Sequence, residues 1–129
     1  MKPIIWNYGG GIHSVAIGLL ISEGRLPTPE RAVIADTGRE KRTTFEYLRD
    51  FMQPELDKVG LAVEIAPHSL ARVDLYDNQG GVLIPAFTKD GAGQLRTFCA
   101  GEWKRDVVMR WLRQPERGYG PQNPIIQWI

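Results

Sequence analysis

The sequence lacks the paired cysteines, zinc motifs and long apolar runs that stabilise or anchor many small proteins. Its 129 residues include one cysteine, which excludes an intramolecular disulfide, and two histidines without the spacing of a zinc motif. The longest apolar run, VAIGLLI, is far shorter than the roughly 20 residues that cross a bilayer, and no long apolar leader opens the chain. A net charge of +1 gives no global basic field for nucleic acid. These absences favour a cytoplasmic protein in a reducing compartment, without a membrane or nucleic-acid partner.

The length and the 43% hydrophobic content suit one domain over residues 1–129. Short β-branched runs predict strands at 3–8, 32–36, 61–66 and 124–129. Apolar spacings of three and four predict helices at 12–23, ending at Gly24, at 40–59, ending at Gly60, and at 102–113. Pro54 should kink or divide the second helix, and Ser69 is expected to cap a short helix over 69–78. Residues 79–98 are expected to form a long irregular connection. Alternating strands and helices predict an α/β fold with a doubly wound, mostly parallel sheet.

Three consecutive glycines follow the first predicted strand, in the stretch NYGGGIHS at residues 7–14. In a parallel sheet, ligands bind where a strand's carboxyl end feeds the next helix. Glycine allows the backbone to approach a ligand closely, and the amides that open a helix attract anions. Ser14 and His13 would add side-chain donors. The alternative is a tight turn that needs glycine only for steric reasons.

Four stretches in order resemble one known family. Residues 9–14, GGGIHS, resemble the PP-loop, usually S-G-G-x-D-S, of the adenine nucleotide alpha hydrolase-like superfamily, especially its phosphoadenosine phosphosulfate reductase family and phage relatives. Residues 34–38, IADTG, resemble its "xxDTG" and precede Thr44 and Tyr47, where the family often has "T..Y". Residues 84–88 and 96–104 resemble its "R..C....K" segment. Together they cover most of the chain.

The resemblance implies a three-layer, Rossmann-like domain that binds an adenine nucleotide, either ATP or phosphoadenosine phosphosulfate. In the family, the nucleotide is cleaved between its α and β phosphates or gives its sulfonate to a cysteine, which implies nucleotidyl or sulfur transfer in a bacterial or phage-infected cytoplasm. Catalytic roles are implied for Cys99 and Lys104. The implied nucleotide-binding residues are Gly9, Gly10, Gly11, His13, Ser14, Asp36, Thr37, Gly38 and Arg96.

The chain also departs from the family pattern. Gly9 replaces the first serine and His13 the aspartate, and imidazole is a poor ligand for Mg²⁺, so metal-assisted chemistry is weakened. The reductase's C-terminal cysteine motif is absent, and we expect the chain to stop partway through the family's domain. These departures leave two alternatives open: a catalytically inactive nucleotide-binding or host-interaction module, and a fragment whose terminal strand, PIIQWI, pairs with a second copy or a partner chain.

For three of the candidate site residues, a purely structural role is an alternative to the functional one. Cys99, with Lys104 and Arg105 nearby in sequence, is either a reactive thiol or a small buried hydrophobic residue. Asp36 is either a ligand contact or the cap of the helix that begins near Glu40. His13 is either a phosphate donor or an ordinary residue of a helix's first turn.

Overall fold

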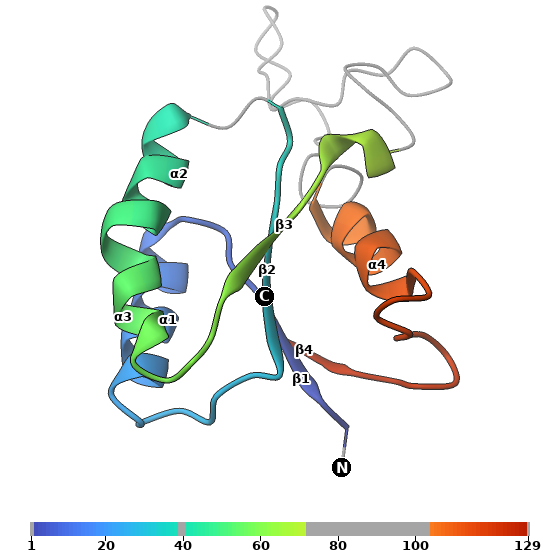
Figure 1. The fold of residues 1–129 in the computed structure, drawn as a ribbon, viewed down its shortest axis with the longest axis horizontal. Coiled ribbons are helices and arrows are strands. Elements are labelled where there is room, and N and C mark those ends of the chain that lie inside the picture. The colour runs from blue at the N-terminus through green and yellow to red at the C-terminus, as the bar shows by residue number, and fades with distance from the viewer. Residues whose placement is uncertain (1, 39–40, 72–103, 129) are drawn as a thin grey trace, which may run out of the picture.

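The computed structural model describes residues 2–38, 41–71 and 104–128. Its first half alternates strands with helices, as predicted (Figure 1). The strands are β1 (Ile4–Asn7), β2 (Arg31–Ala35), β3 (Val63–Ala66) and β4 (Ile126–Trp128). The helices are α1 (Ile12–Ser22), α2 (Arg42–Tyr47), a π-helical segment (Leu48–Met52), α3 (Gln53–Asp57), a 3₁₀ turn (His68–Leu70) and α4 (Asp106–Arg113).

The four strands form one sheet in the order β3-β2-β1-β4, and every neighbouring pair is parallel. The predicted mostly parallel α/β sheet is therefore confirmed in the described part of the chain. Because all four strands run the same way, their carboxyl ends lie at one edge of the sheet. The loops after β1, β2 and β3 therefore leave from that edge.

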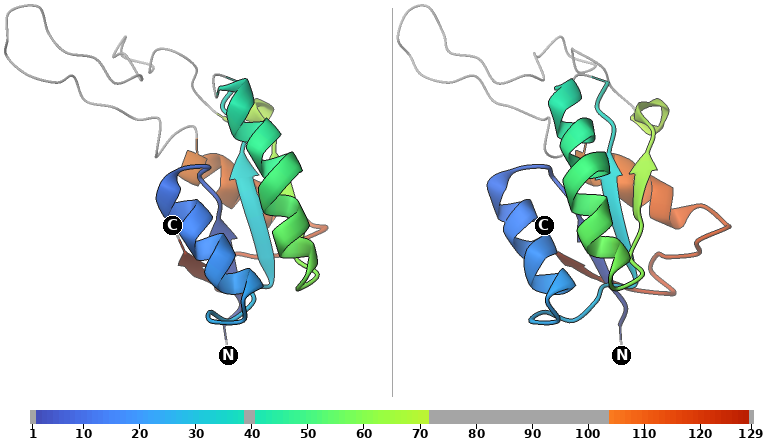
Figure 2. Two further views of the ribbon diagram at one scale, coloured as in Figure 1. Left: turned by 90° about the vertical axis from the view of Figure 1, so that its left-hand side faces the viewer. Right: turned by 60° about the vertical axis from the view of Figure 1, so that its left-hand side comes forward.

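Both faces of the sheet are covered by helices. Trp6, Ala32 and Ile34 point to the side of α1, α2 and α3, where they pack in one buried cluster with residues such as Met52 and Leu56. The intervening strand residues point to α4 on the opposite side (Figures 1 and 2). This alternation follows from the two-residue period of a strand, and burial on both faces explains why β2 is apolar from Ala32 to Ala35.

Pro54 changes the type of helix rather than ending it. Residues 42–57 stay helical, but the five residues Leu48–Met52 form π-helix just before the proline. Proline has no amide hydrogen, and its ring clashes with the carbonyl four residues earlier in an α-helix. Directly before the proline, the amide of Gln53 bonds to the carbonyl of Leu48, five residues earlier, which is the wider π-type turn. The predicted division at Pro54 is thus a change from π- to α-helical bonding, within one continuous helical segment.

Several predicted boundaries are confirmed and one is wrong. Gly24 and Gly60 have φ values of +75° and +71°, as expected of residues that end helices. Ser69 does not cap a helix, because the 3₁₀ turn already begins at His68 and the chain is extended again at Ala71. The rest of the predicted 69–78 helix and the 79–98 connection lie outside the described residues. The terminal strand β4 occupies an edge of the sheet, with Ile126 43% exposed.

Candidate functional site

The glycine turn joins β1 to α1 at the carboxyl edge of the sheet, where the sequence placed it. The amide of Tyr8 still bonds to the carbonyl of Val33 at 2.8 Å, so the turn starts from a fixed position beside β2. Gly10 then takes a φ of +78°, and Gly11, with φ −85° and ψ 177°, is the residue from which α1 begins. The reversal needed to enter the helix is therefore made at Gly10.

The three glycines differ in what the fold requires of them. A Cβ on Gly10 would lie 2.5 Å from Cγ2 of Thr44 in α2, so both its conformation and its contact require glycine. A Cβ on Gly9 would lie 3.3 Å from the hydroxyl oxygen of Ser14, a tight contact. A Cβ on Gly11 would meet nothing within 4 Å. Packing therefore explains Gly10 and does not explain Gly11.

The first turn of α1 offers backbone amides. No side chain caps this helix, and its first backbone bond runs from the amide of Val15 to the carbonyl of Gly11 at 3.0 Å. The amides of residues 12–14 precede that bond, so no carbonyl of the same helix faces them. Ser14 accepts a bond from the amide of Gly9 at 2.9 Å and keeps its own hydrogen to donate. His13 is exposed at the surface.

The loop after β2 lies at the same edge. Asp36 accepts a bond from the amide of Gly38 at 2.8 Å and so closes a local turn, while its own amide bonds to Ala66 at 2.9 Å. Thr37 is buried, and a Cβ on Gly38 would lie 3.8 Å from the ring of His68. Since α2 has no side-chain cap, Asp36 does not cap the following helix. That alternative interpretation of Asp36 is wrong.

Two buried polar groups flank the glycine turn and were missed from the sequence. The side-chain oxygen of Asn7 and the hydroxyl of Tyr8 are buried without a hydrogen-bond partner among the described residues. Burial, and to a lesser extent Tyr47, raises the pKa of Tyr8, so its hydroxyl stays a donor. The ring of Tyr8 also lies against Gly10, 4.0 Å from the position of a Cβ there. The available signal was a polar and an aromatic residue directly before the glycines.

The remaining predicted site residues are less informative. Lys104 is half-buried just before α4, whose amino end lies at the carboxyl edge of the sheet (Figure 1). Arg96 and Cys99 lie outside the described residues. The structure thus brings Gly10 against Thr44, and Gly38 against His68.

In the part of the chain that the structure describes, no group of three or more acidic, histidine or cysteine side chains is placed to hold a metal ion. None of the helices in that part is both long and apolar enough to cross a membrane. Comparison with protein-family models, with curated proteins and with solved structures finds no match. What the fold and site define is an α/β protein whose glycine turn presents helix amides at the carboxyl edge of a parallel sheet.

Proposed function

We propose that the glycine turn binds the phosphate of an adenine nucleotide, and that the chain is a three-layer, Rossmann-like PP-loop domain similar to the phosphoadenosine phosphosulfate reductases. The observation that carries this proposal is the open space around Gly11. The turn's geometry requires glycine at position 10, whereas at position 11 the space around the backbone is open. A glycine that neither a positive φ nor a packing contact requires, at the start of a helix without a side-chain cap, suits a backbone that a ligand approaches closely.

In this proposal the helix dipole and the amides of residues 12–14 hold the phosphate, and Ser14 adds its hydroxyl. The loop with Asp36 and Gly38 lies at the same edge and faces the ribose or adenine side of the nucleotide. Lys104, and Arg96 outside the described residues, supply positive charge. Mg²⁺ is a possible but disfavoured part of this site, because the turn carries His13 where a carboxylate would suit the ion better.

Two outcomes of binding follow from the same site. With Cys99 and Lys104 the protein would catalyse sulfur or nucleotidyl transfer. A catalytically inactive binding module is favoured by one observation: where the family has a serine and an aspartate, the turn has Gly9 and the exposed His13, and neither suits Mg²⁺. What remains at the turn is mostly backbone, and backbone amides bind anions without activating a nucleophile.

The test is isothermal titration calorimetry of the full chain with ATP, AMP and phosphoadenosine phosphosulfate, repeated on Gly11→Ala. We expect one of these nucleotides to bind the wild type, and Gly11→Ala to bind it at least about tenfold more weakly while it stays folded, with a loss of stability of about 1 kcal/mol or less. Gly120→Ala is the matched control, because its Cβ would make only an ordinary contact, 3.9 Å from Arg113. Absence of binding by the folded wild type, or equal binding by Gly11→Ala, would contradict the proposal.

Incubation with the bound nucleotide then separates the two outcomes. Release of pyrophosphate or sulfite, lost in Cys99→Ser or Lys104→Gln, supports an enzyme. Binding without turnover supports the inactive module.

A further inference from the structure

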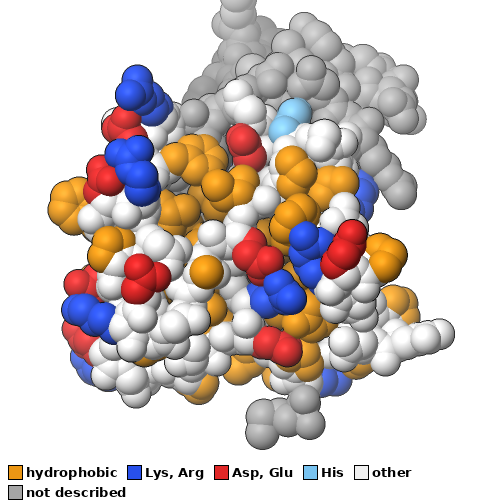
Figure 3. Space-filling model, viewed as in Figure 1, with side chains coloured by type: hydrophobic (Ala, Val, Ile, Leu, Met, Phe, Trp, Pro, Cys, Tyr) orange, Lys and Arg blue, Asp and Glu red, His pale blue; other side chains and the backbone are white. Residues whose placement is uncertain are grey.

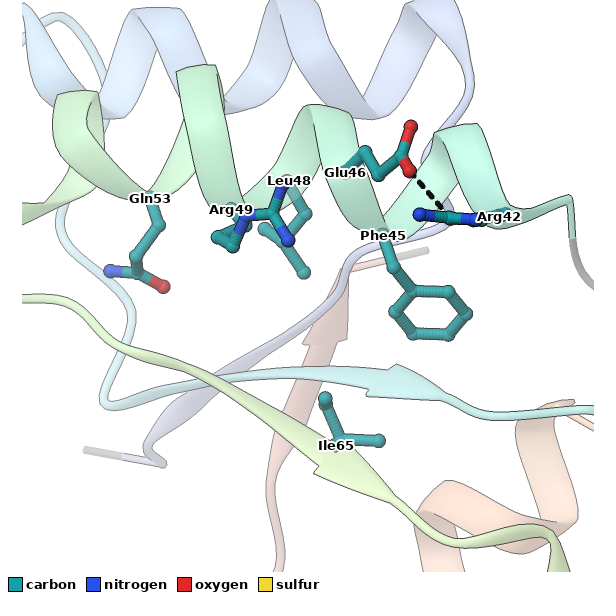
Figure 4. Close-up of a pocket in the computed structure, with 7 residues that line it drawn as sticks. All are labelled: Arg42, Phe45, Glu46, Leu48, Arg49, Gln53 and Ile65. Carbon is teal, nitrogen blue, oxygen red and sulfur yellow. Dashed lines mark ion pairs between the residues drawn. The ribbon is translucent and has the colours of Figure 1, made fainter.

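A groove of about 510 Å³ lies between the helical segment of residues 42–53 and β3, which is an outer strand of the described sheet. Figure 4 shows Phe45 and Ile65 pointing toward one another across it. Figure 3 shows hydrophobic side chains gathered at the surface between α2 and β3. The groove is lined by Arg42, Phe45, Glu46, Leu48, Arg49, Gln53 and Ile65.

The backbone edge of β3 is closed at both ends. At its start, the side-chain amide of Gln53 donates to the carbonyl of Leu61 at 2.9 Å and accepts from the amide of Val63 at 2.9 Å. At its end, Pro67 has no amide hydrogen, and its carbonyl accepts a bond from the amide of Leu70 at 3.1 Å. A long added strand would therefore find no complete ladder along this edge.

Between these two ends, Ile65 presents a free amide and a free carbonyl. The amide and carbonyl of alternate residues in a strand face the same side. Val63 faces outward to Gln53, whereas Ala66 faces β2, since its carbonyl accepts a bond from the amide of Asp36 at 2.9 Å. The backbone groups of Ile65 therefore face outward, and neither has a partner among the described residues. The free part of the edge is one residue long, with one donor and one acceptor.

One donor and one acceptor on a single residue match the same residue of a second copy. In an antiparallel pair of strands, two residues directly opposite each other exchange both N–H···O bonds. Ile65 opposite the partner's Ile65 makes such a pair. The twofold axis between them gives each copy the same two bonds, as in other contacts that use one surface patch twice.

The same arrangement places one apolar side chain of each copy beside the groove. Directly opposite residues in an antiparallel pair point to the same face of the sheet, with their Cβ atoms about 5 Å apart. The partner's Ile65 therefore points toward the helical segment beside Phe45, and it covers an isoleucine that is 49% exposed. Its neighbours in the strand, Glu64 and Ala66, point to the face of α4 and need no room in the groove.

The charged residues beside the groove do not oppose a second copy. Arg42 pairs with Glu46 at 2.7 Å, and Arg49 pairs with Asp50 at 2.7 Å. These two pairs leave the flank of the helical segment without a net charge. A flank without net charge does not repel an identical flank, and it offers no attraction to a strongly charged partner.

We propose that β3 is a contact between two copies of this chain, which pair antiparallel at Ile65 and join their sheets into one. The twofold axis is perpendicular to the sheet, so the helices α1, α2 and α3 of both copies lie on the same face. Because the contact is small, we expect weak, reversible association with a dissociation constant between about 10 µM and about 1 mM. This surface is separate from the glycine turn and does not depend on the nucleotide proposal.

Sedimentation velocity of the full chain over that concentration range is the first test. The average mass should rise from that of a monomer toward that of a dimer and no further, because the pairing at Ile65 closes on itself. The amide signal of Ile65 in a ¹H–¹⁵N spectrum should shift with protein concentration. This second measurement needs no substitution, so it remains informative where a variant lowers stability.

Variants at the twofold axis test which residue lies there. Ile65→Lys and Ile65→Glu each place two like charges opposite one another, and each should weaken association at least about tenfold. An equimolar mixture of the two variants should associate again, because residue 65 of one then faces an opposite charge at residue 65 of the other. Ile126→Lys is the matched control, since Ile126 is 43% exposed on β4, the other outer strand, and its substitution should leave association unchanged.

Three results would overturn the proposal. The first is a wild type that stays monomeric throughout the concentration range. The second is equal weakening by Ile65→Lys and Ile126→Lys, which would place the contact elsewhere. The third is a mixture of Ile65→Lys and Ile65→Glu that stays monomeric although circular dichroism shows both variants folded.

Discussion

Gly10→Ala should destabilise the protein more than an ordinary surface substitution, for two separable reasons. At φ +78° the new Cβ crowds its own backbone, which costs about 1 kcal/mol. It also lies 2.5 Å from Cγ2 of Thr44, so α2 or the turn must move. Inserting a carbon into a filled space costs about 1–3 kcal/mol, which gives about 2–4 kcal/mol in total. A loss of this size is a large fraction of the stability of a small domain.

Urea denaturation followed by circular dichroism measures this loss, with Gly11→Ala as the matched neighbour. Gly11 has a φ of −85° and open space around it, so its substitution should cost only the preference for glycine over alanine at an N-cap, about 1 kcal/mol or less. The double variant Gly10→Ala, Thr44→Ala removes Cγ2 and should recover the steric part of the loss, while the backbone part remains. Equal stability of Gly10→Ala and Gly11→Ala would refute the reasoning. A double variant without any recovery would show that Thr44 is not the cause.

Three further predictions concern groups away from the glycines. Gln53→Ala should lower the free energy of unfolding, measured by urea denaturation, by about 1–3 kcal/mol, since it leaves the half-buried amide of Val63 without its partner. An unchanged midpoint would show that this hydrogen bond does not stabilise the fold. Tyr8→Phe should leave stability unchanged or raise it at neutral pH, and it should reduce the loss of stability above about pH 10. The reason is that burial raises the pKa of Tyr8 in the folded protein, so the phenol ionises first in the unfolded chain. A fall of stability with pH as steep as that of the wild type would contradict this. Glu64→Gln should lower the free energy of unfolding by about 1 kcal/mol, because Glu64 accepts bonds of 2.8 and 2.9 Å from Arg31. In an Arg31→Leu background the same substitution should cost much less. Equal costs in both backgrounds would show that the pair contributes nothing.

The strands and helices were predictable because both faces of the sheet are buried. β2 reads as a continuous apolar run for this reason, and the spacing in α4 matches a helix that buries Val107, Val108 and Leu112 against the sheet. Local chemistry also identified the glycines that end helices. The π-helical segment before Pro54 was not predictable, since proline marks a lost hydrogen bond without saying how the neighbouring turns adapt.

The candidate sites depend on contacts between segments far apart in sequence. The stretch NYGGGIHS marks a turn, but only its packing against Thr44 separates the glycine that the fold requires from the one that it does not. The contact between the helical segment of residues 42–57 and β3 gave no sequence motif. It exists because Gln53 reaches Leu61 and Val63, and because the same helical segment places Phe45 opposite Ile65. The spacing of apolar residues indicates which face of a helix or strand is buried. It does not indicate which other segment of the chain packs against that face.

At the glycine turn, the backbone and the side chains support different parts of the proposal. The donors that would hold a phosphate are the amides of residues 12–14, and the geometry at Gly10 and the bond from Gly9 to Ser14 fix the turn that presents them. None of these features needs the serine and the aspartate of the usual PP-loop pattern, at whose positions this chain has Gly9 and His13. An anion site made of backbone tolerates those two replacements, whereas metal-assisted chemistry does not. The proposed nucleotide binding therefore rests on features that the turn retains, whereas any catalysis would depend on residues elsewhere in the chain.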